Sequence, residues 1–341
     1  MKRGFSLSMF AIVLTGAILI GSIPLQAQDK VIRLRYADIT PAAHKRAKLT
    51  VEWCNEIEKR TNGRVKITHF AGSTLVSPMQ VYDSTVKGIA DIGQSLMSYA
   101  PGRLPLTEFL SLPLGFTSGY QATKLANEYY KKFQPKEFSD SKVMLLHASG
   151  SCIFMTRKPI QKTEDLKGLR IKVNSENADI AHAVGAAPVT MPVGETYDGL
   201  QRGLLDGMLL SVETLKGYRF GEVIKTVLEN HAFSYATGLY VIMNKARWDS
   251  FPKDIQAIIE KVNEDYVEKY AQLWNEMEKE GKDYGLSKGV TFVNVSKEEQ
   301  ARWAEKMKPI LAQYAKEAKA KGLPADEVLK FAQDYVRTTN P

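Results

Sequence analysis

The chain has little of what catalysis by common motifs, metal binding or nucleotide binding requires. Its 341 residues include two cysteines and five histidines, and none of them falls in a CxxC, HExxH or other zinc-like spacing. The sequence also lacks a GxSxG elbow, a phosphate-binding P-loop and a GxGxxG dinucleotide motif. We therefore expect no metal, no cofactor and no catalytic activity.

Both cysteines can be explained without a catalytic role. Cys54 lies beside Trp53 on an expected helix face, where a small buried thiol is the ordinary outcome. Export would permit a disulfide with Cys152, but a single pair in a long chain does not require one. Ser149, Ser151 and Cys152 do form a short Ser-Gly-Ser-Cys turn, yet no local motif supplies the base that a nucleophile needs. Because a triad is recognised by geometry, an exported hydrolase stays the less favoured alternative.

Charge of one sign is not concentrated anywhere in the chain. The 46 Lys and Arg residues outnumber the 38 Asp and Glu residues, but the excess is spread along the sequence without a basic block or an aromatic-interleaved patch. The apolar fraction of 44% and the charged fraction of 25% are typical of a globular protein. A mildly basic, solvated surface is expected, and nucleic acid is not an expected partner.

A long apolar run occurs at the N-terminus and nowhere else. Two basic residues precede apolar residues 9–20, and small residues follow as far as Ala27. This pattern predicts a signal peptide over residues 1–27, cleaved near Ala27, and hence a periplasmic protein. Leu25 fits a small-x-small cleavage site poorly, and an uncleaved anchor is the alternative. No later segment approaches the roughly 20 apolar residues of a membrane-spanning helix, so the mature chain is not expected to be membrane-embedded.

The remaining chain, roughly 310 residues, is long enough for two lobes. Its first third predicts strands at 32–36, 65–71 and 89–93, with helices from Thr40-Pro41 to Asn62-Gly63 and over 80–87. This β-α-β-α-β order predicts a mostly parallel sheet covered by helices.

A second unit of the same kind begins near Lys142. Further strands are expected at 143–146, 153–156, 169–173, 204–210 and 239–243, with helices at 178–184 and 195–202. Lys- and Glu-rich helices follow, one of them starting at a Ser296–Glu299 capping box. Because no Gly/Pro-rich linker separates two domains, the lobes are expected to share the chain by repeated crossing.

Three consecutive segments carry a resemblance to a known family. They are TEDLKGLRIKV (163–173), VGAAPVTMP (184–192) and ETYDGLQRGLLDG (195–207). In this combination they resemble the solute-binding subunits of TRAP transporters, the DctP-like family. Shorter matches occur in order along essentially the whole mature chain: RTNGRV (60–65), GIADI (88–92), LPLGF (112–116), LYVIMN (239–244) and FPKDIQ (251–256).

The resemblance implies an α/β fold of the periplasmic-binding-protein-like type II class. Two α/β lobes would be joined by crossing strands, with a ligand cleft between them and a long helix bracing both. We assign residues 28–149 plus about 236–280 to lobe I, and 150–235 plus about 281–341, with bracing C-terminal helices, to lobe II. The implied activity is capture of a small-molecule solute and its delivery to TRAP membrane permease subunits, without turnover.

Lys172 is the main candidate for contact with the solute. Residues 169–173 alternate as a strand does, and a cation at the end of a strand near the lobe boundary can meet an anionic ligand in a desolvated cleft. Arg170 is expected to be a surface cation instead.

The sequence departs from the family at three expected ligand positions. The family commonly has arginine where this chain has Lys172 and Cys152, and asparagine where it has Leu210. Lysine lacks the planar fork with which arginine holds a carboxylate. One explanation is a more apolar monoanion held by Lys172, such as an aromatic or branched carboxylate or a sulfonate. The other is an uncharged or cationic solute oriented by other groups, among them Glu213.

Weaker candidates come from matching positions in the family. Ser95, Leu96, Met97 and Tyr99 follow the third strand, and Phe233 and Tyr235 precede the return to lobe I. His44 stands at the start of the first helix. Each of these side chains has ordinary core packing as its alternative.

Overall fold

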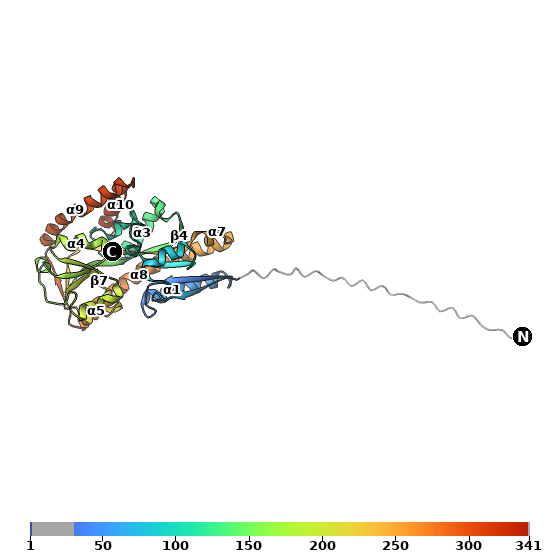
Figure 1. The fold of residues 1–341 in the computed structure, drawn as a ribbon, viewed down its shortest axis with the longest axis horizontal. Helices are drawn as coiled ribbons and strands as arrows, with labels where there is room; N and C mark the ends of the chain where they lie inside the picture. Colours follow the sequence, from blue (N-terminus) through green and yellow to red (C-terminus); the bar gives the residue numbers. More distant parts are fainter. Residues whose placement is uncertain (2–30, 340–341) are drawn as a thin grey trace. The chain divides into compact units, whose positions relative to one another are not determined.

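The structure is a computed structural model that describes residue 1 and residues 31–339, so the signal peptide predicted over residues 1–27 lies, apart from its first residue, outside the described residues. The described chain forms a mixed sheet with helices on its faces (Figure 1). The strands are β1 (Ile32–Asp38), β2 (Val65–Phe70), β3 (Ile92–Leu96), β4 (Ser141–Thr156), β5 (Arg170–Val173), β6 (Ala187–Thr190), β7 (Gly207–Ser211), β8 (Thr226–Glu229), β9 (Tyr235–Asn244) and β10 (Thr291–Asn294). The helices are α1 (Lys45–Arg60), α2 (Val81–Val86), α3 (Gly119–Phe133), α4 (Ala178–Ala183), α5 (Thr196–Gln201), α6 (Thr214–Gly217), α7 (Lys245–Asp249), α8 (Lys253–Ser287), α9 (Lys297–Ala320) and α10 (Ala325–Thr338).

The strand order is β2-β1-β3-β9-β4-β7-β5-β6, with β8 beside β4 and β10 beside β8. At one end β1 pairs in parallel with β2 and β3, which confirms the parallel sheet predicted from the β-α-β-α-β order. At the other end β5 pairs in parallel with β6 and β7. Between these ends β9 and β4 run antiparallel to each other and to their neighbours β3 and β7.

The antiparallel strands β4 and β9 join two α/β lobes. The first half of β4 contributes Val143 and Leu146 to an apolar core with α3, whereas its second half contributes Cys152 and Phe154 to a different core with β5 and α4. The crossing strands and the two lobes are therefore as the resemblance implied. The boundaries of the lobes along the sequence stay a prediction.

The structure corrects the prediction that 143–146 and 153–156 are separate strands. β4 is one strand, and its pairing with β9 shifts register between Ala148 and Ser151. The segment predicted to be a turn is thus an irregularity within a strand. Gly150 permits it, because a Cβ there would lie 1.9 Å from the carboxyl carbon of Glu278 on α8.

Three other element boundaries also differ from the prediction. The first helix begins at Lys45, not at Thr40-Pro41, because Asp38 Oδ1 accepts the Thr40 N–H and holds a turn there. β3 begins at Ile92 because α2 ends before Gly88, which has a left-handed backbone. β7 likewise starts at Gly207, after a turn at left-handed Gly203.

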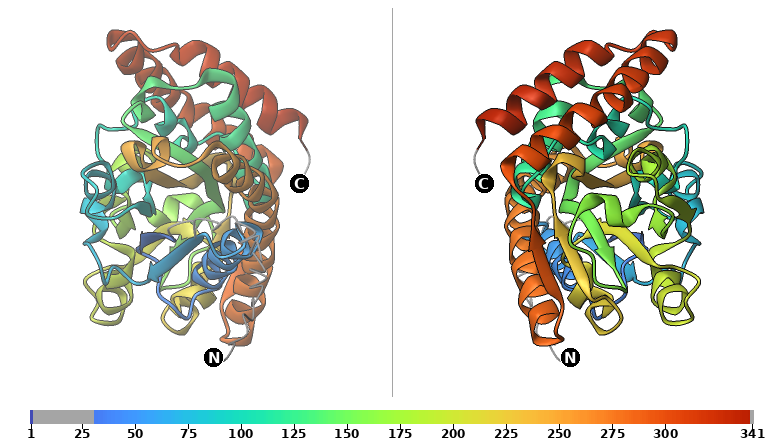
Figure 2. Two further views of the ribbon diagram at one scale, coloured as in Figure 1. Left: turned by 90° about the vertical axis from the view of Figure 1, so that its right-hand side faces the viewer. Right: turned by 90° about the vertical axis from the view of Figure 1, so that its left-hand side faces the viewer.

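Helix α8 is the long bracing helix that the resemblance implied. Figure 2 shows it, in orange, along one side of the folded unit, with the red helices α9 and α10 together at one end. α9 begins after Ser296, whose side chain accepts the Glu299 N–H as predicted. No helix within residues 31–339 is both long enough and apolar enough to cross a membrane.

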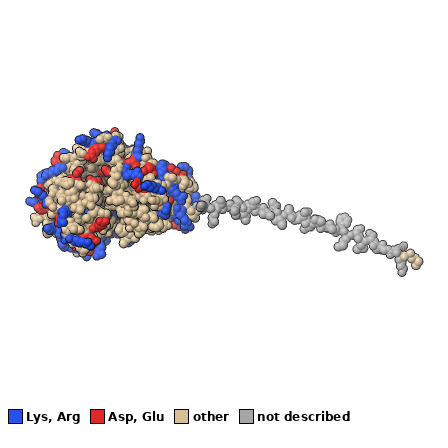
Figure 3. Space-filling model, viewed as in Figure 1, with Lys and Arg blue, Asp and Glu red and all other residues tan. Residues whose placement is uncertain are grey.

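Charged side chains of both signs are dispersed over the face visible in Figure 3. Arg170 is among the exposed cations, and its guanidinium Nε lies 2.9 Å from Asp206 Oδ2. The prediction that Arg170 is a surface residue is confirmed.

Candidate functional site

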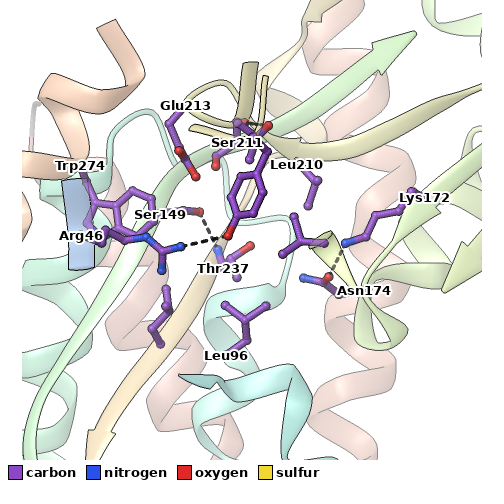
Figure 4. Close-up of a pocket in the computed structure, with 14 residues that line it drawn as sticks. Arg46, Leu96, Ser149, Lys172, Asn174, Leu210, Ser211, Glu213, Thr237 and Trp274 are labelled. Atoms are coloured by element: carbon purple, nitrogen blue, oxygen red, sulfur yellow. Dashed lines mark hydrogen bonds between the residues drawn. The ribbon is translucent and has the colours of Figure 1, made fainter. Parts of the chain in front are cut away.

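A buried cavity lies where the two lobes meet beside β4 and β9 (Figure 4). About 40 Å³ of it is wide enough for water-sized contents, which is room for roughly three water molecules. Its described walls come from both lobes and from the crossing strands. They are Arg46, Leu96, Ser149, Lys172, Asn174, Val193, Leu210, Ser211, Glu213, Thr214, Tyr218, Thr237, Leu239 and Trp274.

Lys172 enters this cavity from the interior of the sheet. β5 lies between β6 and β7, and the side chain of Lys172 is 0% exposed. Its Nζ donates to Asn174 Oδ1 at 2.8 Å. Burial lowers the pKa of Lys172 to about 8, against the opposing charge of Glu176. Lys172 is thus a cation whose charged form is destabilised in the ligand-free protein.

Arg46 is a second buried cation, on the opposite side of the cavity in Figure 4. It lies in the first turn of α1, and its guanidinium lies 5.1 Å from the ring centre of Trp274 on α8. Nη2 donates to the Tyr218 hydroxyl at 3.4 Å. Nε and Nη1 are buried and have no hydrogen-bond partner among residues 31–339. Two strong donors therefore stay unused at this side.

Glu213 brings a carboxylate to the same side as Arg46. It is 4% exposed, and its Oε2 makes no hydrogen bond within the described chain. The nearest cationic candidate is His44, whose Nε2 lies 3.3 Å from Oε2 without hydrogen-bond geometry. His44 Nδ1 accepts the Arg46 backbone N–H at 3.2 Å as the cap of α1, so in the neutral ring the hydrogen is on Nε2, facing Glu213.

Glu213 and His44 also border an outer pocket, which has about 320 Å³ of space for water-sized contents. Its rim carries both signs of charge, because Lys45 and Lys216 both pair with Glu280, at 2.5 and 2.9 Å. Gly217 closes the wall between the two spaces, since a Cβ there would lie 2.5 Å from Glu213 Oε2. The Glu213–His44 pair thus separates the buried cavity from the outer pocket.

Several residues singled out from the sequence lie at this cavity. Lys172, Leu210, Glu213 and Leu96 line it. Cys152 lies just behind the wall, with its Sγ 3.5 Å from Ser149 Oγ and 3.4 Å from Thr237 Oγ1. The Tyr99 hydroxyl accepts the backbone N–H of Val193, a wall residue, at 3.1 Å. His44 is not among the described wall residues, but it contacts Glu213, which is one of them.

The other four candidates lie away from the cavity walls. Ser95 donates to the Pro78 carbonyl, and Met97 packs in the core of the first lobe. Phe233 packs edge-on against Phe154 in the second core. The Tyr235 hydroxyl donates to the Leu209 carbonyl at 3.0 Å. Their role as ligand contacts stays a prediction that this conformation does not support.

Sequence reasoning missed Arg46, Asn174, Thr237 and Trp274 as wall residues. Arg46 stands in a helix turn with Lys45 and Lys48, where a cation ordinarily faces water. Its burial depends on α8, which is more than 200 residues away in the chain. Of these four residues, Asn174 is the one that sequence reasoning could have identified, because it directly follows the strand that carries Lys172.

A nucleophile with a positioned base does not line this cavity. Ser151 Oγ lies 2.9 Å from His231 Nδ1, but Ser151 is buried and neither residue is among the described wall residues. Burial lowers the pKa of His231, and burial raises the pKa of the Cys152 thiol to about 11. Both cysteines are free thiols in the described structure. No cluster of metal-ligating side chains occurs within residues 31–339.

Comparison with known families gives one match over most of the chain. Residues 36–317 match the model of the family described as bacterial extracellular solute-binding protein, family 7. The C4-dicarboxylate-binding periplasmic protein DctP of Rhodobacter capsulatus is 26% identical over 320 residues, which cover 89% of this chain and 92% of that protein. The 2,3-diketo-L-gulonate-binding periplasmic protein YiaO of Escherichia coli is 27% identical over 266 residues, covering 75% and 78%.

Solved structures agree in fold. A TRAP periplasmic solute-binding protein from Desulfovibrio salexigens, described as an open complex, is 31% identical, covers 89% of this chain and 95% of its own, and superposes with a TM-score of 0.81. A marine metagenome TRAP solute-binding protein specific for aromatic acid ligands is 23% identical, covers 91% and 100%, and has a TM-score of 0.85.

Proposed function

Because the chain belongs to family 7 of the bacterial extracellular solute-binding proteins, the solute receptors of TRAP transporters, we propose that it captures a small organic anion between Arg46 and Lys172. The solute is then delivered to TRAP permease subunits in the membrane. Residues 1–27 direct the chain to the periplasm and are removed near Ala27. The protein binds its solute without converting it.

The observation that carries this proposal is a pair of buried cations from different lobes in the wall of one cavity. Arg46 comes from α1 and Lys172 from β5, and the donors of Arg46 are partly unused within residues 31–339. At Lys172 the effect of burial outweighs the attraction of Glu176, so its charge destabilises the ligand-free protein. An anion placed between the two cations adds a counter-charge beside Lys172 and an acceptor for the unused donors of Arg46, and its contacts with both lobes favour their closure.

The composition of the wall limits the charge and size of the solute. Two of the described wall residues are cations and one, Glu213, is a carboxylate, so the wall favours an anion and disfavours a second negative charge near Glu213. Leu96, Leu210 and Leu239 supply apolar contacts for a short carbon body. A cationic solute would meet two like charges, which disfavours it. Two similar proteins support an organic acid as the solute: one is a C4-dicarboxylate-binding protein, and the other was solved with bound orotic acid.

The experiment is a thermal-shift and calorimetric screen at pH 7 with monocarboxylates, dicarboxylates, sulfonates, amines and polyols. We expect monoanions to raise the melting temperature by mass action and the amines and polyols to leave it unchanged. Replacement of Arg46 by methionine should weaken binding of the best anion about 10- to 100-fold, because a charge-assisted hydrogen bond is lost. The matched control is Arg170→Met, which removes an exposed arginine from the same strand as Lys172.

Two results would contradict the proposal. One is an amine or polyol as the best ligand of the panel. The other is chemical conversion of the bound acid, which mass spectrometry of the ligand recovered from the protein would reveal and which would favour the hydrolase alternative.

A further inference from the structure

His147 is a buried histidine that the proposed capture of a solute does not use. It lies on β4, is 0% exposed and is not among the described wall residues. Burial, and next the positive charge of Arg46, lower its pKa well below the usual value, so the ring is neutral at pH 7. Its Nδ1 accepts a hydrogen bond from the indole Nε1–H of Trp274 at 3.1 Å. The ring hydrogen is therefore on Nε2, which has no partner within the described chain.

Trp274 connects His147 to the cavity. The indole belongs to the cavity wall, and the Arg46 guanidinium lies over it at 5.1 Å from the ring centre. At this distance the π-electrons of an indole attract a guanidinium. Because a buried indole N–H needs an acceptor, the bond to His147 fixes the plane in which Trp274 offers its face to Arg46.

Arg46 has few other contacts that order its side chain. Nη2 reaches the Tyr218 hydroxyl at 3.4 Å, which is a long hydrogen bond, and Nε and Nη1 make none within residues 31–339. An arginine side chain loses much conformational freedom when it is ordered. A guanidinium that is held in place before the solute arrives does not lose this freedom on binding, so its contacts contribute more to affinity.

A second path of contacts runs from His147 to the backbone of Arg46. The His147 ring stacks on Tyr270, with the ring centres 4.4 Å apart and an angle of 7° between the planes. The Tyr270 hydroxyl lies 2.8 Å from Thr50 Oγ1, and Thr50 donates to the Arg46 carbonyl at 3.1 Å. His147 is thus in contact with the supports of both the side chain and the helix turn of Arg46.

From these contacts, and resting on the proposed function, we infer that His147 is a positioning residue of the solute site: by accepting the Trp274 N–H it sets the indole that holds the Arg46 guanidinium. His147 does not touch the solute. It raises affinity through Arg46.

Two substitutions separate this role from packing. His147→Asn keeps an acceptor near the place of Nδ1 and loses the ring that stacks on Tyr270. His147→Phe keeps a ring and loses the acceptor. If His147 only filled space, His147→Phe would be the milder change for binding. As a positioning residue it gives the opposite order: we expect His147→Phe to raise the Kd about 3- to 30-fold, and His147→Asn no more than about threefold. Equal Kd values in His147→Phe and the wild type would overturn the inference.

The probe is the tightest binder among propionate, isovalerate, benzoate and methanesulfonate, measured by calorimetry at pH 7. A double-mutant cycle with Arg46→Met shows through which residue His147 acts. In the Arg46→Met background, His147→Phe should leave the Kd unchanged, because the group that His147 positions is gone. An effect of the same size in both backgrounds would mean that His147 shapes the cavity in general, which contradicts the inference.

The indole of Trp274 gives a spectroscopic signature that needs no solute. The chain has four tryptophans, and the indole N–H resonance of Trp274 in the 15N-labelled protein is the one missing in Trp274→Phe. It should move upfield in His147→Phe, where the N–H has lost its acceptor, and stay near its wild-type position in His147→Asn. An unmoved resonance in His147→Phe would show that the bond does not set the indole.

Asn263→Leu is the matched control. Asn263 Oδ1 accepts the indole N–H of Trp53 at 3.0 Å, a bond of the same kind in a core that contributes no described wall residue at Trp53. Its loss should lower the melting temperature and leave the Kd unchanged. If His147→Phe does not fold, His147→Leu, which also lacks an acceptor, replaces it in each comparison.

The outcomes also separate this inference from the proposed function. If Arg46→Met weakens binding of the probe and His147→Phe does not, the inference is wrong while anion capture stands. If Arg46→Met binds the probe as tightly as the wild type, or no anion of the panel binds, the proposed function itself fails.

Discussion

Replacing Lys172 by methionine should stabilise the ligand-free protein while it weakens anion binding. Lys172 is fully buried, and burial lowers its pKa from 10.5 to about 8. A shift of this size means that the folded protein disfavours the charged side chain by about 3 kcal/mol. Methionine has a similar length and no charge. Its introduction removes this penalty but also the hydrogen bond to Asn174, which contributes about 1 kcal/mol. The net gain at pH 7 is about 2 kcal/mol.

The stabilisation by Lys172→Met should depend on pH, in a direction set by the lowered pKa of Lys172. The pKa of Lys172 is lower in the folded than in the unfolded protein, so the penalty is fully present below pH 8, where both states are protonated. It shrinks between pH 8 and pH 10.5 and vanishes above, where the lysine is neutral in both states. The advantage of Lys172→Met should follow the same course.

Urea denaturation of both proteins at pH 7 and pH 10 measures the difference in the free energy of unfolding. Arg170→Met is the control, and loss of its exposed pair with Asp206 should change stability by less than about 1 kcal/mol. The reasoning is refuted if Lys172→Met is less stable than the wild type at pH 7, or if its advantage is the same at both pH values. Either result would mean that Lys172 stabilises the ligand-free fold.

Three further predictions concern the same region. Affinity for the best anion, measured by calorimetry, should be constant up to about pH 7.5 and fall about tenfold per pH unit well above pH 8, because Lys172 loses its proton; Lys172→Met should show no such fall. Burial also raises the pKa of the Glu278 carboxyl to about 8. If the fall in affinity disappears in Glu278→Gln instead, Glu278 and not Lys172 is the titrating group. Gly217→Ala should lower the free energy of unfolding by about 1–3 kcal/mol in urea, because its Cβ would lie 2.5 Å from Glu213 Oε2; unchanged stability would contradict the tight wall. Gly150→Ala should lower the free energy of unfolding by at least as much, because its Cβ would lie 1.9 Å from Glu278 Cδ. Gly194→Ala is the control: no described heavy atom lies within 4 Å of its Cβ, so its free energy of unfolding should change little.

Most of the fold could be predicted because it follows from local periodicity. The alternation of residues 169–173 predicted the strand β5, and the place of Lys172 at the end of that strand near the lobe boundary predicted its burial at the cavity. The β-α-β-α-β order of the first third predicted a parallel sheet, which β1, β2 and β3 confirm. Three of the errors fall at glycines, and the fourth, the start of α1, falls at a turn held by Asp38. From the sequence alone Gly150 predicts a turn, but within the sheet the absence of a side chain at Gly150 leaves room for the carboxyl group of Glu278 on α8.

The site was predictable only in part, because its second cation depends on distant contacts. Lys172, Leu210 and Glu213 follow strand patterns and family positions in one continuous stretch of sequence. Arg46 has the local pattern of a surface residue, and what buries it is Trp274 on α8. Met97 and Phe233 were drawn from positions rather than from physical patterns, and their side chains complete the two cores.

An insertion or deletion in the long helix α8 would keep its contacts only if it added or removed about a whole number of helical turns. Its residues at positions 270, 274, 277 and 281 lie on one face and meet, in order, Thr50 of α1, the cavity, the outer pocket and the backbone at Val212. One residue inserted before Trp274 would turn everything that follows by about 100° and carry the indole out of the wall. The same rule holds to the last turn of α8, where Gly285 is buried against Leu215 and the Tyr284 hydroxyl donates to Glu222 at 3.0 Å.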